Sequence, residues 1–124
     1  MAKTILVVDD SGTMVLSLKN NLELAGYAVV TASDGVKGLE RLKAAPKPDL
    51  IITDINMPNM GGIEFIGKAR ATAGFRFTPI LVLTTESQQA RRDEAKKLGA
   101  TGWMVKPVGG ADLIKIVKQV LPGA

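Results

Sequence analysis

The chain has 124 residues, of which 46% are hydrophobic and 23% charged, and a net charge of +4. This fits one globular domain, long enough to bury about two thirds of the surface that the unfolded chain exposes. The absence of Cys and His excludes disulfide scaffolds, thiolate or imidazole zinc sites and Ser-His-Asp catalysis. Apolar runs are far shorter than the roughly 20 residues of a membrane span, and the N-terminus lacks a signal-peptide pattern. We therefore expect a cytoplasmic protein without membrane insertion.

The first half of the chain alternates short apolar strands with amphipathic helices. The strands are predicted at Thr4–Val8, Tyr27–Ala32 and Leu50–Thr53. The first helix ends at Gly26, a residue typical of left-handed C-caps, and its predicted inner face comprises Val15, Leu18, Leu22 and Ala25. The second helix is predicted over Asp34–Ala45, ends before Pro46 and Pro48, and is expected to bury Val36, Leu39 and Leu42.

The second half repeats this alternation. After a loop from Asp54 to Gly62, a helix is predicted through Ile63, Ile66 and Ala69, with a connection from Thr72 to Thr78. Strands are predicted at Pro79–Thr84 and Thr101–Val105. Between them, a helix is predicted from about Gln88 to Leu98, with Gly99 as its C-cap candidate. Its predicted inner face comprises Ala90, Ala95 and Leu98. The last helix, Ala111–Leu121, stops before Pro122. Strand–helix units of about 25 residues predict an α/β fold with a parallel sheet.

Reactive side chains stand at the ends of four predicted strands. Asp9 and Asp10 follow the first strand, Asp54 follows the third, Thr84 ends the fourth and Lys106 follows the fifth. The carboxyl ends of parallel strands share one edge of the sheet, where open α/β sheets bind their ligands. We therefore expect three carboxylates, a hydroxyl and an ammonium group to converge.

Carboxylates gathered in this way repel one another, and a divalent cation among them is the simplest remedy. Oxygen ligands favour Mg²⁺, Mn²⁺ or Ca²⁺ over zinc and copper. Two or three carboxylates leave coordination positions for water and a phosphate oxygen, which is how Mg²⁺ usually binds. The residues therefore predict a Mg²⁺-assisted phosphoryl site, in which Mn²⁺ is an alternative ion.

The rest of the surface is basic, because the net charge rises from +4 to +7 when Asp9, Asp10 and Asp54 are left out. The chain has few aromatic residues and no basic helix interleaved with them, so we expect no nucleic-acid partner. An acidic protein partner fits better, and the alternative is that the basic residues only keep the domain soluble. The same two interpretations apply to a basic helix surface formed by Arg91, Arg92, Lys96 and Lys97.

The combined pattern resembles the receiver domain of two-component response regulators over the whole chain. It consists of the acid pair, Asp54 before an Asn-Met-Pro loop, Thr84, and Lys106 followed by Pro107. The resemblance implies a flavodoxin-like, doubly wound (βα)5 fold with five parallel strands in the order 2-1-3-4-5. It also implies a single receiver domain over residues 1–124 with no output domain, most like the stand-alone regulators of chemotaxis.

The resemblance assigns a role to each acidic residue. Asp54 matches the phosphoacceptor, whose carboxylate becomes an acyl phosphate. Asp9 and Asp10 match the metal-binding pair, with direct ligation assigned to Asp10. Asn56 is expected to offer its backbone carbonyl to the metal, in a loop that a proline at position 58 restricts. The structural alternatives are that Asp54 caps its loop and that Asp9 or Asp10 caps the first helix.

Three further residues match parts of the family's switch. Lys106 matches the lysine that pairs with phosphoryl oxygens, and its bond to Pro107 is cis in many relatives. Thr84 matches the switch hydroxyl. Trp103 stands at the switch aromatic position, usually Tyr or Phe, and Thr85 stands where many relatives have a smaller residue. We therefore expect the indole to stay outward or partly inserted in both states. Each residue also has a purely structural interpretation. Lys106 would be an ordinary surface lysine, Thr84 a buried strand residue and Trp103 an aromatic residue that packs on a helix.

The implied function is to receive a phosphoryl group from a histidine kinase onto Asp54 with Mg²⁺. Phosphorylation would then switch binding of a downstream protein, such as a flagellar motor switch component, on the face of the fourth and fifth strands. We expect a monomer that assists only its own phosphorylation and dephosphorylation. The alternatives are a phosphorelay intermediate, a phosphate sink, a haloacid-dehalogenase-like Mg²⁺-dependent phosphatase, or an interaction module with a degenerate site. The phosphatase normally has Asp-x-Asp, which the run Asp9-Asp10-Ser11 lacks.

Overall fold

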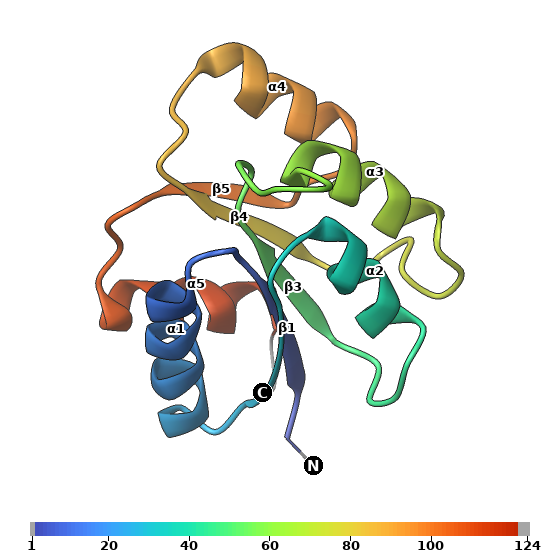
Figure 1. Cartoon of the computed structure of the whole chain (residues 1–124). Coiled ribbons are helices and arrows are strands. Elements are labelled where there is room, and N and C mark those ends of the chain that lie inside the picture. Colours follow the sequence, from blue (N-terminus) through green and yellow to red (C-terminus); the bar gives the residue numbers. More distant parts are fainter. Residues whose placement is uncertain (1, 122–124) are drawn as a thin grey trace.

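The computed structural model describes residues 2–121. Its strands form one parallel sheet in the order β2-β1-β3-β4-β5, of which β1, β3, β4 and β5 are labelled in Figure 1. The strands are β1 (Thr4–Val8), β2 (Ala28–Ala32), β3 (Leu50–Thr53), β4 (Ile80–Thr84) and β5 (Gly102–Val105). The fold class and the strand order expected from the sequence are confirmed.

Helices cover both faces of the sheet. They are α1 (Gly12–Leu24), α2 (Gly35–Leu42), α3 (Gly62–Ala71), α4 (Gln89–Lys97) and α5 (Gly110–Val120). Helices α2, α3 and α4 lie on one face, and α1 and α5 on the other (Figure 1). Within residues 2–121, no helix combines the length and the apolar character that crossing a membrane requires.

The central strands are buried on both faces, which is why they appear in the sequence as uninterrupted apolar runs. Successive side chains of a strand point to opposite faces. In β1, Leu6 and Val8 therefore join the core under α2 and α3, whereas Ile5 and Val7 join the core under α1 and α5. All residues of β1, β3 and β4 are buried, so these strands form a rigid platform beneath the site.

The predicted element boundaries agree with the structure for β1 and β3 and need correction elsewhere. Helix α2 is shorter than Asp34–Ala45, because Asp34 is an extended N-cap residue and the helix ends at Leu42. Three side chains predicted to face inward are instead exposed on the solvent side of their helices: Val36, Ala90 and Leu98. Pro122, the predicted stop after the last helix, lies outside the described residues.

Candidate functional site

The sheet's hydrogen bonding continues one residue beyond three of its strands. Asp9, Asp54 and Lys106 each donate their backbone N–H to a carbonyl oxygen of the neighbouring strand, at 3.1, 2.9 and 2.8 Å. These three residues therefore have backbones as fixed as those of the strands that precede them. Their side chains project from one edge of the sheet.

The predicted carboxylates and ammonium group do converge at this edge. Asp9, Asp10 and Asp54 each place a carboxylate oxygen within 4.8 Å of the others. The Nζ atom of Lys106 lies 2.8 Å from Oδ2 of Asp9 and 3.1 Å from Oδ2 of Asp54. Asp9 and Asp54 are buried while Asp10 is exposed, so the cluster is open to solvent on the side of Asp10.

The remaining carboxylate oxygens differ in their partners. Oδ1 of Asp54 accepts the N–H of Ile55 at 2.6 Å, and Oδ1 of Asp9 accepts the N–H of Ser11 at 2.9 Å. Within residues 2–121, the carboxylate of Asp10 accepts no hydrogen bond. The N-cap of α1 is Ser11, whose hydroxyl accepts a helix N–H. The alternative that Asp9 or Asp10 caps this helix is therefore wrong.

Lys106 neutralises much of the charge in the cluster. Burial of its ammonium group alone would lower the pKa, but hydrogen bonds to Asp9 and Asp54 outweigh burial and raise the pKa of Lys106 above its ordinary value. The side chain is therefore fully charged at neutral pH. It occupies the position between Asp9 and Asp54 as an internal counterion.

The other predicted site residues lie around this cluster. Thr84 is fully buried at the end of β4, and its Oγ1 accepts the N–H of Glu86 at 3.2 Å, which leaves its hydroxyl proton available. Asn56 is exposed in the loop that follows Asp54. The Lys106–Pro107 peptide bond is cis.

Trp103 lies apart from the cluster. It packs against the core under α2, α3 and α4, whereas its neighbour Met104 belongs to the core under α1 and α5. The indole is half-buried, and its Nε1 has no hydrogen-bond partner within residues 2–121. That the indole stays outward or partly inserted in both states remains a prediction.

Sequence reasoning missed a buried acid beside the site. Asp34 accepts the N–H of Lys37 at 2.9 Å and the side-chain amide of Asn59 at 2.8 Å. The backbone hydrogen bond from Lys37 lowers the pKa of Asp34 the most, and the side-chain hydrogen bond from Asn59 lowers it further. Asp34 thereby joins the start of α2 to the loop after Asp54. The predicted helix includes Asp34; an Asp at a helix start is an N-cap signal that could have indicated the cap, but not the contact with Asn59.

Gly62 closes the other end of that loop. Its N–H donates to the carbonyl of Ile55 at 2.8 Å. A Cβ atom at this position would lie 2.0 Å from the carbonyl oxygen of Asp54. The first residue of α3 must therefore be glycine for the helix to pack directly on the backbone of Asp54.

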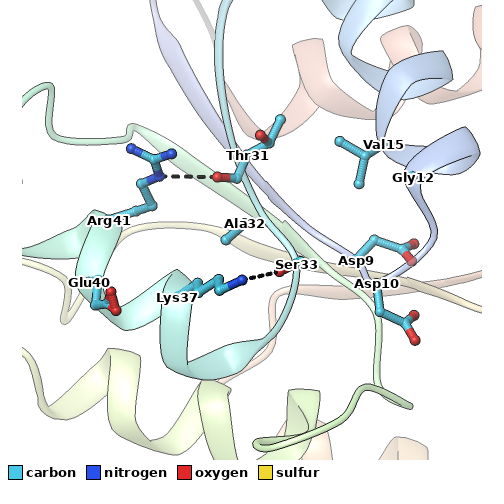
Figure 2. A pocket seen from close by; sticks show the side chains of 10 residues that line it. All are labelled: Asp9, Asp10, Gly12, Val15, Thr31, Ala32, Ser33, Lys37, Glu40 and Arg41. Carbon is cyan, nitrogen blue, oxygen red and sulfur yellow. Dashed lines mark hydrogen bonds between the residues drawn. The ribbon is translucent and has the colours of Figure 1, made fainter.

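A groove of about 560 Å³ extends from the acid pair between α1 and α2. Figure 2 shows Asp9 and Asp10 at one end, and Lys37 and Arg41 of α2 on the opposite wall. Nε of Arg41 donates to a backbone carbonyl of β2 at 3.1 Å. The site is thus an acidic cluster with basic side chains on both flanks, suited to a hard cation and to an anion with oxygen atoms.

Comparison with known proteins identifies the class. Residues 5–118 match the response regulator receiver domain, and the chain belongs to this family. This membership separates it from the haloacid-dehalogenase phosphatases considered as an alternative. The chain is 41% identical to the chemotaxis protein CheY1 of Helicobacter pylori over 104 residues, which cover 83% of this chain and 84% of CheY1.

Two further relatives show how widely the domain is used. The chain is similar to the chemotaxis protein CheY4 of Vibrio cholerae, with 42% identity, a TM-score of 0.91, and coverage of 97% of this chain and 99% of that one. It is also 39% identical over 121 residues to PhoP of Bacillus subtilis, an alkaline phosphatase synthesis transcriptional regulatory protein. That match covers 98% of this chain and 49% of PhoP. The chain is therefore a CheY-like receiver domain.

Proposed function

We propose that the protein is a stand-alone response regulator in which Asp54 accepts a phosphoryl group from a phosphohistidine of a separate kinase. The observation that carries this proposal is the position of Lys106, whose ammonium group joins two of the three clustered carboxylates. The chain contains no His, so the phosphohistidine must belong to another protein. The chain covers 84% of CheY1 and 99% of the CheY4 chain, and both are chemotaxis proteins.

The donor set fits Mg²⁺. It consists of oxygen atoms, and the carboxylate of Asp10 has no hydrogen-bond partner within residues 2–121 that would compete with a cation. Asp9, Asp10, Asp54 and the backbone carbonyl of Asn56 would hold the ion, with Mn²⁺ as a substitute. When bound, Mg²⁺ would offset the negative charge that develops on the phosphoryl oxygens.

The chain's own residues would carry the transfer step. A carboxylate oxygen of Asp54 forms a bond to phosphorus while the bond from phosphorus to the kinase imidazole breaks, and the electron pair of that bond leaves with the imidazole nitrogen. Lys106 then contacts phosphoryl oxygens as well as carboxylates. The hydroxyl of Thr84 donates a hydrogen bond to the phosphoryl group. This new hydrogen bond biases the equilibrium between the inactive and the active conformation.

The proposed readout surface is the face of α4 and β5. A groove of about 230 Å³ there is lined by Arg92, Lys96, Ala100, Thr101, Gly102 and Trp103. Its two basic side chains and its indole suit an acidic, amphipathic segment of a partner. The proposed partner is a chemotaxis component such as a flagellar motor switch protein. A phosphate sink would bind no such partner, and a relay intermediate would pass the phosphoryl group onward.

The chemistry is tested by titrating the protein with Mg²⁺ and then with fluoroberyllate, a phosphoryl mimic, while following the fluorescence of Trp103, the single tryptophan. We expect saturable changes in both titrations. Asp54→Asn should abolish the fluoroberyllate response. The matched control is Asp49→Asn, because Asp49 adjoins the opposite end of β3, where it accepts the N–H of Thr4, and it should respond as the wild type. An unchanged response of Asp54→Asn would place the phosphoryl site elsewhere.

The product of the reaction is tested separately. Incubation with phosphoramidate and Mg²⁺ should give a phosphoprotein whose label is released by hydroxylamine, as expected of an acyl phosphate. Release of inorganic phosphate from generic phosphate esters at catalytic rates would instead indicate a phosphatase.

A further inference from the structure

A third groove lies at the edge of the sheet opposite the acidic cluster. It has a volume of about 520 Å³ and lies between the loop from α2 to β3 and the loop from α3 to β4. Its basic and aromatic side chains are Lys47, Arg76 and Phe77. We call these three residues with their groove the basic-aromatic groove. The proposed phosphoryl chemistry uses none of them.

Phe77 is presented to solvent by a fixed loop. It is 87% exposed, whereas Phe75 is 2% exposed and anchors the loop in the core. The guanidinium group of Arg70 donates to the carbonyl oxygens of Phe75 and Thr78, on either side of Phe77. Because the loop is held on both sides of Phe77, it would lose little conformational entropy when a partner binds the ring.

The cations of the groove are available for a partner. Nζ of Lys47 lies 5.0 Å from the ring of Phe75, and the guanidinium of Arg76 lies 5.4 Å from the ring of Phe77. Within residues 2–121, neither cation pairs with a carboxylate. The acid in the groove, Asp49, accepts the N–H of Thr4 at 2.8 Å. The groove therefore combines two positive charges that no carboxylate pairs and the one carboxylate of Asp49 with an exposed ring.

The charge and shape of the groove identify its occupant. We propose that the basic-aromatic groove binds an acidic peptide segment of another protein, with carboxylates at Lys47 and Arg76 and an apolar side chain on Phe77. A concave site fits a narrow chain better than a flat lipid surface. A single exposed ring does not offer the series of stacking platforms that single-stranded nucleic acids use.

This surface is separate from the proposed phosphoacceptor and readout surface. Asp49 immediately precedes β3, and Asp54 immediately follows it at the opposite edge. Peptide binding at the groove should therefore be the same with and without fluoroberyllate. It should also be unaffected by Asp54→Asn, so that failure of this inference and failure of the proposed function are distinguishable.

The test is a selection of peptides from a random phage-displayed library on the full-length protein, followed by affinity measurements on the selected peptides. We expect one group of peptides to be acidic with at least one apolar residue, and to bind at least tenfold more weakly to Phe77→Ser and to Arg76→Glu. Lys118→Glu, an equal charge change on the exposed side of α5, should leave their affinity unchanged. The variants are compared with the wild type by circular dichroism to confirm that they are folded.

Other outcomes overturn the inference. The first is that no selected peptide is sensitive to Phe77→Ser. The second is that the sensitive peptides carry no acidic residues. The third is that Lys118→Glu lowers their affinity as much as Arg76→Glu does. The lipid alternative is examined by co-sedimentation with phosphatidylglycerol vesicles, with phosphatidylcholine vesicles as the control. Sedimentation with the anionic vesicles that Phe77→Ser abolishes would assign the groove to a membrane surface and overturn the peptide proposal.

Discussion

Helices α3 and α4 each follow a strand that contributes to the candidate site, yet they are held very differently. Helix α3 begins shortly after Asp54 and buries five of its residues: Gly62, Ile63, Phe65, Ile66 and Ala69. Helix α4 begins shortly after Thr84 and buries only Ala95. The helix beside the proposed phosphoacceptor is thus part of the core, whereas the helix beside the proposed switch hydroxyl lies on its surface.

The difference separates a fixed region from an adjustable one. Neither helix has a side-chain cap at its N-terminus, so for α4 no cap makes up for its lack of buried side chains. Arg91 pairs with Glu86 and Glu94 at 3.8 and 3.5 Å, and such exposed ion pairs contribute about 0–1 kcal/mol each. Few interactions therefore oppose a shift of α4, while Asp54 keeps its position. A small displacement of Thr84 would therefore shift mainly the position of α4.

The largest expected effect comes from a substitution that disrupts the packing of α3 in the fixed region. Gly62→Ala forces a Cβ atom against the backbone of Asp54, and we expect a loss of about 3 kcal/mol or more in the free energy of unfolding. Gly67→Ala is the matched control, because its Cβ would meet only Leu98, at 3.8 Å, and it should stabilise the protein by about 0.5–1 kcal/mol. Urea denaturation measures both. Equal effects of the two substitutions would contradict the tight packing of α3 on Asp54.

A smaller effect concerns the connection between the two helices. Arg70 of α3 donates from Nε and Nη2 to the carbonyl of Gly99, just after α4, at 3.2 and 2.7 Å. Lysine lacks this forked geometry, so Arg70→Lys should lower the free energy of unfolding by about 2 kcal/mol. Lys68→Arg, on the exposed side of the same helix, is the control. Wild-type stability in Arg70→Lys would show that a positive charge without the forked hydrogen bonds is enough to hold α3 to the end of α4.

Hydrogen exchange sharpens the comparison without any substitution. Backbone amides of α4 should be protected about tenfold less than those of α3, which corresponds to about 1.4 kcal/mol in opening free energy. Mass spectrometry of peptides covering the two helices measures the ratio. Equal protection would mean that α4 opens only together with the core.

The smallest effect is a pH dependence at Lys106, which links β5 to the fixed region. Since the pKa of Lys106 is raised in the folded state, the stability it contributes is complete below its unfolded pKa of about 10.4. It is lost as the pH rises through the folded pKa. Lys106→Met should therefore be less stable than the wild type by about 1 kcal/mol at pH 7 to 10, and this difference should shrink at higher pH. Urea titrations at several pH values test it, and a difference that already shrinks between pH 7 and 9 would contradict the raised pKa.

The sequence was sufficient to predict the elements whose signals are local. The strands β1 and β3 have both faces buried, and their apolar runs end where the strands end. The left-handed residues Gly26 and Gly99, at φ of 98° and 111°, end α1 and α4 as predicted. The convergence of Asp9, Asp54 and Lys106 followed from parallel topology alone.

Features that depend on tertiary contacts were not predictable. No local sequence signal indicates the contacts of Arg70, because its acceptors are backbone carbonyls of loop residues 5, 8 and 29 positions further along the chain. Leu98 was assigned to the interior from helical spacing, but at the C-cap of α4 it is 39% exposed. Spacing shows which residues share a face of a helix, and it does not show how much of that face the neighbouring elements cover.

The ammonium group between Asp9 and Asp54 has a consequence for the life cycle of the molecule. This side chain, charged at neutral pH, would serve as a place-holder, so that departure of the proposed metal would leave Asp9 and Asp54 paired with a cation. Under the proposed function, the fold would then tolerate repeated loading and release of the ion. Magnesium would control whether the protein signals, and not whether it persists.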